Sequence, residues 1–167
     1  MGFAGAETLG FVLPDVTKNL LLFVETDGCF ADGIEAATGC SVGHRTLRVQ
    51  DTGKVAATFV DTTTGRAVRV APAPSVRERA PAYAPGEARR YYAQLTGYQR
   101  MPTAELLTVR VVTLTIDLAT LLGDRATRVE CAACGEEILN GREVRSGGGL
   151  FCCSCLDSSY YEPLAHA

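Results

Sequence analysis

Hydrophobic and polar positions near the N-terminus predict a buried strand between two helices. Residues 20–24 form an unbroken apolar run, Leu-Leu-Leu-Phe-Val, with polar residues on both sides. A run of this length is typical of a strand that is buried on both faces. Residues 1–13 indicate the end of a helix stopped by a proline, and small and apolar residues return at roughly helical spacing from Cys29 to Gly39. We therefore expect the strand to run directly into a helix at residues 27–29.

Alternating apolar and polar positions continue the pattern with a series of strands. The segments 45–50 and 54–60 alternate, and residues 51–53 between them read Asp-Thr-Gly. This linker predicts a β-hairpin, because glycine tolerates a positive φ angle. A second turn at 61–65 leads into another strand at 66–70, so we expect an antiparallel meander.

Prolines between residues 72 and 85 interrupt the ladder and mark a long connection, because a proline has no backbone N–H to donate. Beyond them, residues 87–97 and 102–106 are predicted to be helical, and β-branched residues predict a strand over 107–116. Residues 118–128 read as a tether. The predicted fold class is α+β, with helices packed on an antiparallel sheet and a small C-terminal appendage.

Length and composition fit this division and narrow the range of partners. A chain of 167 residues has room for a core domain over residues 1–120 and a small domain over 128–161. The net charge of -3 disfavours nucleic acid as a partner, because counterion release rewards a concentrated basic face. No apolar run approaches the roughly 20 residues of a membrane-spanning helix. The N-terminus lacks the features of a secretory signal, so we expect a cytoplasmic protein with reduced cysteines.

The C-terminal segment carries the strongest chemical signal of the sequence. Cys131 and Cys134 form one Cys-x-x-Cys pair, and Cys152 and Cys155 form another. Two such pairs at this separation predict a tetrahedral four-sulfur site for one structural Zn²⁺ ion. The adjacent Cys153 is an alternative third ligand, although the two-residue gap favours Cys152. A redox-active pair is the weaker interpretation, because it leaves the second pair unexplained.

Four blocks of the sequence, taken together, resemble a known family. They are ETDGCFAD at 25–32, TGCSVG at 38–43, DTGKVA at 51–56 and CAACGE at 131–136. In combination they are similar to the E-subunit family of formylmethanofuran dehydrogenase. The resemblance implies an α+β core with a treble-clef zinc finger, in which the first cysteine pair forms the knuckle and the second opens a short helix. It also implies association, as a homodimer.

The resemblance has one gap at the N-terminus. Family members usually begin with a His-x-His-x-Cys-Pro-Gly segment, whose His and Cys are candidate metal or active-site groups, and this sequence lacks it. We expect the chain to be a truncated gene product that starts at an internal Met, rather than one that has lost half of its site. The family name does not by itself place the protein in a dehydrogenase complex.

The core contains a second set of candidate residues. Cys29 follows the buried strand and opens a helix, where the helix dipole favours a thiolate that acts as nucleophile or metal ligand. Asp27 and Asp32 flank it as candidate bases. Cys40 and His44 would add ligands if the turns converge, which makes the core a candidate for a second metal.

Each of these residues also has a purely structural interpretation. Cys40 is equally well explained as a small buried residue at a tight turn, and for His44 a solvated loop is favoured. Lys54 follows the glycine of the predicted hairpin and is a candidate for binding an anionic cofactor, although an exposed turn lysine is the commoner outcome. For Cys29 we favour a functional site, because ligands gather where strands lead into helices.

Two functions follow from these candidates. The first is an accessory or ligand-binding subunit whose zinc finger docks a partner protein. The second is a metal-dependent, oxidoreductase-associated enzyme in which Cys29 holds a catalytic metal and Asp27 or Asp32 acts as base. The enzyme needs a complete set of metal ligands in the core, whereas the binding role does not.

Overall fold

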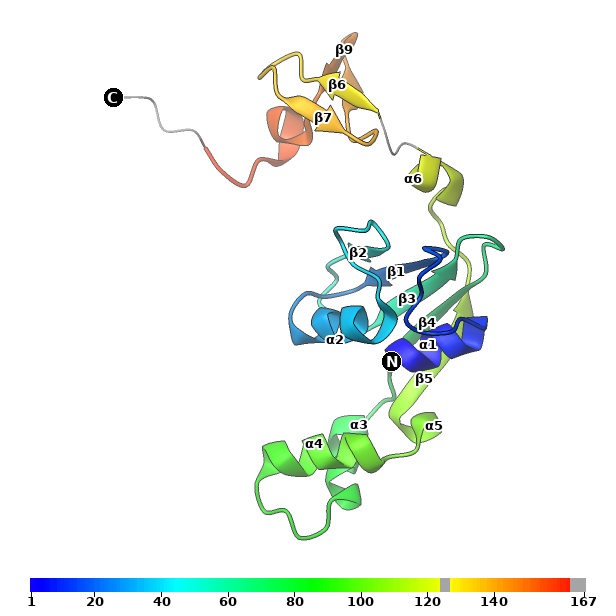
Figure 1. Cartoon of the computed structure of the whole chain (residues 1–167). Coiled ribbons are helices and arrows are strands. Elements are labelled where there is room, and N and C mark those ends of the chain that lie inside the picture. The colour runs from blue at the N-terminus through cyan, green and yellow to red at the C-terminus, as the bar shows by residue number, and fades with distance from the viewer. Residues whose placement is uncertain (124–126, 163–167) are drawn as a thin grey trace. The chain divides into compact units, whose positions relative to one another are not determined.

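The computed structural model describes residues 1–123 and 127–162, and it divides into two compact units, Met1–Leu114 and Thr115–Ala167 (Figure 1). Mixed α+β architecture with mainly antiparallel pairing confirms the predicted fold class. Among the described residues, no helix has both the length and the apolar character needed to span a membrane.

A five-stranded sheet with the order β2-β1-β3-β4-β5 forms the first unit. Its strands are β1 (Leu20–Val24), β2 (Leu47–Val49), β3 (Ala57–Asp61), β4 (Ala67–Pro72) and β5 (Leu107–Val112). Every residue of β1 is buried, which confirms the prediction made from its unbroken apolar run. The strand lies between two neighbours and is covered on both faces, so it forms the centre of the core.

The predicted hairpin between residues 45–50 and 54–60 is wrong. Strand β2 pairs in parallel with β1, whereas β3 pairs antiparallel with the other side of β1. The reason lies in the linker, whose backbone N–H groups bond to the end of β1. Gln50 donates to the carbonyl of Val24 at 2.8 Å, and Thr52 and Lys54 donate to that of Glu25 at 3.0 and 3.1 Å. The linker therefore folds around the carboxyl end of β1, which separates the two strands.

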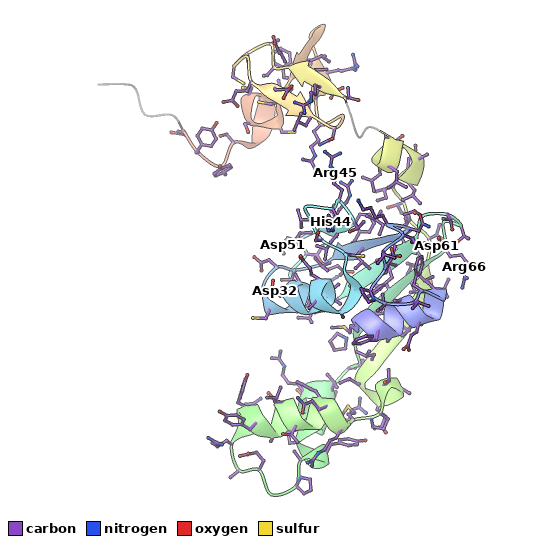
Figure 2. The ribbon with its side chains drawn as sticks, viewed as in Figure 1. Asp32, His44, Arg45, Asp51, Asp61 and Arg66 are labelled. Carbon is purple, nitrogen blue, oxygen red and sulfur yellow. The ribbon has the colours of Figure 1, made fainter. Side chains whose placement is uncertain are left out.

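The second predicted turn, at residues 61–65, does form a hairpin between β3 and β4. The buried carboxylate of Asp61 accepts hydrogen bonds from the hydroxyls of Thr63 and Thr64, each at 2.6 Å. Burial opposes ionisation of Asp61, but these hydrogen bonds prevail and lower its pKa below the ordinary value. Figure 2 shows Asp61 and Arg66 at this turn.

Two helices, α1 (Gly2–Leu9) and α2 (Cys29–Thr38), complete the core of the first unit. Gly39 has a φ of 74° and ends α2 in the left-handed conformation that glycine favours. Helix α1 contacts α2, β3 and β4. The core cluster that these elements enclose includes Ala6, Leu20, Leu22, Val24, Ile34, Cys40, Phe59, Val68 and Val70.

A helical excursion, defined here as residues 73–106, follows β4 and precedes β5. Its elements are α3 (Val76–Arg79), η1 (Ala80–Tyr83), α4 (Arg90–Arg100) and α5 (Thr103–Leu106). The proline-rich connection is therefore folded into short helices. Its buried cluster consists of Val76, Ala80 and Met101, with Tyr83, Tyr98 and Leu106 packed against it.

The second unit is small and contains two hairpins. Its elements are α6 (Leu118–Gly123), β6 (Arg128–Glu130), β7 (Glu137–Leu139), β8 (Val144–Ser146), β9 (Gly149–Phe151) and the helical turn η2 (Ser154–Ser158). Strands β6 and β7 pair antiparallel, as do β8 and β9. The predicted tether, 118–128, begins with α6, and its residues 124–126 lie outside the described residues.

Two helix-interior glycines offer a matched test of the core packing. In α1, a Cβ atom at Gly5 would overlap the ring of Phe59, whereas a Cβ atom at Gly33 in α2 would meet open space. We expect Gly5→Ala to lower the free energy of unfolding by about 1–3 kcal/mol through overpacking. Gly33→Ala should raise it by about 0.5–1 kcal/mol, because alanine favours the helix. Urea unfolding followed by circular dichroism measures both, and equal stabilisation by the two substitutions would contradict the packing of α1.

Candidate functional site

Four cysteine sulfur atoms come together in the second unit. Cys131 follows β6, Cys134 lies in the turn between β6 and β7, Cys152 follows β9 and Cys155 lies in η2. Their Sγ atoms all lie within 4.8 Å of one another, an arrangement that could hold a metal ion. Both hairpins and the helical turn thus contribute to one cluster, which we call the four-cysteine cluster.

Local backbone geometry explains how the first pair is presented. Gly135 adopts a φ of 74°, which lets the chain turn sharply after Cys134. The N–H of Gly135 donates to the carbonyl of Cys131 at 2.9 Å, and the N–H of Cys131 donates to the carbonyl of Glu136 at 2.9 Å. Ala132 also donates to the carbonyl of Leu150 at 2.8 Å, which ties the first hairpin to the second.

The neighbouring cysteine is directed elsewhere. The Sγ atom of Cys153 faces the carbonyl oxygen of Arg142 at 3.8 Å and is not among the four clustered sulfurs. The N–H of Cys152, in contrast, donates to the Sγ of Cys131 at 3.3 Å. Of the two adjacent cysteines, the structure therefore brings Cys152 to the cluster.

Hydrogen bonding within the cluster separates the acidities of its thiols. The N–H groups of Cys152 and Cys134 lower the pKa of Cys131 to about 6, because they stabilise its thiolate. Hydrogen bonding to the thiols of Cys152 and Cys134 raises the pKa of Cys155 to about 12. Four thiolates at this separation would repel one another strongly, so their joint ionisation requires a cation among them.

The donor set fits zinc. Tetrahedral Zn²⁺ binds four cysteine thiolates with bonds of about 2.3 Å, which places the sulfurs about 3.8 Å apart. The upper limit of 4.8 Å in the cluster means that a bound ion would draw the sulfurs inward by about an ångström or less. Cys131 would anchor the set because it is buried, with 2% of its surface exposed.

The first unit contains a second arrangement of interest, at the carboxyl ends of the parallel strands β1 and β2. The carboxylate of Glu25, directly after β1, accepts two hydrogen bonds from the guanidinium of Arg69 on β4, at 2.5 and 2.7 Å. The Arg69 hydrogen bonds lower the pKa of Glu25 below its ordinary value, and the positive charge of Lys54 acts in the same direction. The ion pair fixes the loop from which α2 starts.

The candidate residues around Cys29 lie at this same edge of the sheet. Cys29 opens α2 with an exposed side chain, and Asp27 and Asp32 are exposed on either side of it. Figure 2 shows Asp32 on α2. Within residues 1–123 and 127–162, one group of three or more Cys, His, Asp or Glu side chains could hold a metal ion, and it is the four-cysteine cluster. Cys29, Asp27 and Asp32 do not belong to it. Lys54 is exposed in the linker that wraps β1.

Cys40 and His44 do not join Cys29. Cys40 has 1% of its surface exposed, donates its thiol to the carbonyl of Leu20 at 3.4 Å, and has a pKa raised by burial. Helix α2 separates it from Cys29, and ten helical residues span about 15 Å. His44 is exposed in the loop before β2 (Figure 2). The turns therefore do not converge, and Cys40 packs as a core residue.

Sequence reasoning missed the Glu25–Arg69 pair. A weak signal was present, because Arg69 is the charged residue within an otherwise apolar stretch of β4. Its partner, however, lies 44 residues away along the chain. Only the sheet order, which places β3 between β1 and β4, brings the two side chains within reach of each other.

Comparison with known proteins identifies the family. The family model described as "FmdE, Molybdenum formylmethanofuran dehydrogenase operon" matches residues 1–109. The chain belongs to this family. The match confirms the resemblance seen in the sequence, and it covers strands β1 to β4, the first half of β5, both core helices and the helical excursion.

Two individual proteins add detail to the FmdE assignment. A probable S-adenosyl-L-methionine-binding protein of Archaeoglobus fulgidus is 36% identical over 73 residues, which are 42% of this chain and 20% of that protein. The chain thus spans about a fifth of this curated relative. The crystal structure of a tungsten formylmethanofuran dehydrogenase FmdE-like protein from Syntrophus aciditrophicus aligns with a TM-score of 0.56 and 22% identity, over 93% of this chain and 79% of that one. The latter likeness shows a shared fold.

The Glu25–Arg69 pair of this FmdE-family chain predicts a pH-dependent contribution to stability. The folded-state pKa of Glu25 is lower than the ordinary 4.5, so the pair contributes fully above about pH 4.5 and is lost as the pH falls through the folded-state pKa. Glu25→Gln should lower the free energy of unfolding by about 1 kcal/mol at neutral pH, with the difference vanishing in acid. Urea titrations at several pH values measure this difference in the free energy of unfolding. Glu35→Gln, an exposed change on α2, is the control, and a pH-independent loss in Glu25→Gln would contradict the assignment.

Proposed function

We propose that this FmdE-family chain is a metal-binding accessory or ligand-binding subunit, and that its four-cysteine cluster holds one structural Zn²⁺ ion in a treble-clef finger. The observation that carries the proposal is the gathering of four sulfur atoms within 4.8 Å. With four protein ligands, the ion would have no open position for substrate or water. The metal therefore stabilises the unit and takes no part in a reaction.

The small hydrophobic content of the second unit supports a structural role for the ion. Among its described residues, the buried hydrophobic ones are Cys131 and Ile138. Two such residues cannot offset the conformational entropy that folding removes. Structural zinc contributes about 10–16 kcal/mol of apparent binding energy in small finger peptides, which fold only when the metal is bound.

Exposed hydrophobic side chains on this unit support docking of a partner protein. Leu139, Val144 and Tyr161 are exposed, and Tyr160 is 94% exposed. Apolar side chains that stay exposed on a folded unit are available for contact with a partner protein. We therefore propose the finger as the contact with a protein partner, in the cytoplasm, where thiols stay reduced.

Native mass spectrometry tests the zinc proposal directly. The protein should carry one zinc per chain, and the double variant Cys131→Ser/Cys134→Ser should carry none, because two of the four ligands are gone. Cys153→Ser is the matched control, since its sulfur lies outside the cluster, and it should keep the metal. Loss of zinc in Cys153→Ser, or its retention in the double variant, would contradict the ligand assignment.

A homodimer is the assembly that we propose for the chain. Strand β5 forms one edge of the sheet and leaves Val109 and Val111 exposed, by 40% and 86%. An exposed apolar edge strand is a ready site for pairing with another chain. The same native spectra report the assembly mass, expected at twice the chain mass of 17.7 kDa, and a monomer at micromolar concentration would refute the dimer.

A second candidate function is a metal-dependent enzyme that uses Cys29, with Asp27 or Asp32 as base. The observation that favours it is the exposed thiol at the start of α2, beside the carboxyl ends of parallel strands. The name of the Archaeoglobus fulgidus relative likewise supports a small-molecule site in the core. A metal at Cys29 would need ligands from outside the described residues or from another chain. Among the described residues, Cys29 belongs to no group of three or more Cys, His, Asp or Glu side chains that could hold a metal ion.

Metal analysis of Cys29→Ser separates the two candidates. The accessory role predicts one zinc per chain in both wild type and Cys29→Ser, because the four-cysteine cluster is unchanged. The enzyme predicts a second metal in the wild type that disappears in Cys29→Ser while the first remains. Elemental mass spectrometry on protein purified under reducing conditions gives both numbers, with Cys40→Ala as a control for loss of an unrelated core thiol.

A further inference from the structure

A pocket of about 310 Å³ lies where the helical excursion joins the sheet of the first unit. It is bounded by the end of β4, the start of β5 and the helices α3 and α4. Pockets of this size accommodate a single small molecule. Met1 also lines it, and its apolar wall is formed by Val55, Pro72, Val76, Tyr98, Leu106 and Leu107.

One cationic side chain, Arg77, lines the same pocket. It is exposed, and within the described part of the chain its guanidinium forms no ion pair or hydrogen bond. No carboxylate lines the pocket to neutralise it. An arginine beside an apolar wall without a counter-charge is a ready partner for an anion, because a guanidinium can donate two parallel hydrogen bonds to a carboxylate.

The neighbouring arginine of α3, in contrast, has partners in the structure. Arg79, two residues further along α3, lies 3.6 Å from the carboxylate of Glu105 and donates to the backbone carbonyl of the same residue at 2.7 Å. Arg79 therefore holds α3 to α5. Arg77 has no such structural task, and the adjacent Gln94 bonds only to its backbone carbonyl.

We propose that this pocket binds a small amphipathic anion, a carboxylate with an apolar chain. The apolar chain of the ligand lies against the apolar wall, and the carboxylate of the ligand contacts Arg77. Burial of the ligand's apolar chain supplies most of the affinity, at about 25 cal/mol per Å² of apolar surface. Arg77 favours a negative head group over a neutral or positive one. The site is separate from the four-cysteine cluster and from Cys29.

Isothermal titration of the zinc-loaded protein with decanoate tests the proposal. Decanoate should bind with one molecule per chain, and decanol, which has the same apolar chain, about tenfold more weakly. Arg77→Gln should weaken decanoate binding about tenfold and leave decanol binding unchanged. Arg66→Gln is the matched control, because Arg66 precedes β4 (Figure 2) and the pocket lies at the other end of that strand. This variant should bind decanoate as the wild type does.

A second variant tests the apolar wall without touching the buried cluster. Val55 is 44% exposed and precedes β3, so Val55→Phe should fill part of the pocket without unfolding the protein, and it should weaken both ligands several-fold. The proposal is overturned if decanoate does not bind, if Arg77→Gln and wild type bind it equally, or if Val55→Phe leaves both affinities unchanged. If decanoate does not bind and Val55→Phe is a monomer where the wild type is a dimer, the pocket belongs instead to the contact with a second copy of the chain.

Discussion

The fold of the C-terminal unit depends on the four sulfur atoms of Cys131, Cys134, Cys152 and Cys155. Each of its strands is three residues long, and two hydrophobic residues are buried in its described part. Its two hairpins come together at the four sulfur atoms. Hydrogen bonds from the backbone lower the pKa of Cys131, whereas hydrogen bonds to neighbouring thiols raise the pKa of Cys155. A divalent ion bound among the four sulfurs would remove this conflict, and it would supply free energy that so small a core does not.

The first unit is organised differently, around the buried strand β1. This strand carries the apolar core, and the segments on either side of it set the geometry of its carboxyl end. The linker after β2 folds over that end, Glu25 is fixed by Arg69, and α2 starts there with Cys29 exposed. The arrangement resembles the ligand-binding edge of other sheets with parallel strands, and it brings no complete set of metal donors together among the described residues.

Local sequence signals predicted much of the fold. The apolar run of β1, the glycine that ends α2 and the cysteine spacing all act within a few residues, so they can be read without knowledge of the tertiary structure. The hairpin predicted over residues 45–60 failed because β1 inserts between its two strands, and parallel pairing leaves no local signature. The Glu25–Arg69 pair and the Arg77 pocket were out of reach for the same reason, since each joins residues that only the sheet order and the helical excursion bring together.

X-ray absorption at the zinc edge tests the central claim, that one zinc ion is held by four sulfurs, most directly. The account predicts a single shell of four sulfur atoms at about 2.3 Å from the metal. The same shell should persist in Cys153→Ser. A shell containing nitrogen or oxygen at about 2.0–2.2 Å, or the absence of stoichiometric zinc from the purified protein, would contradict it.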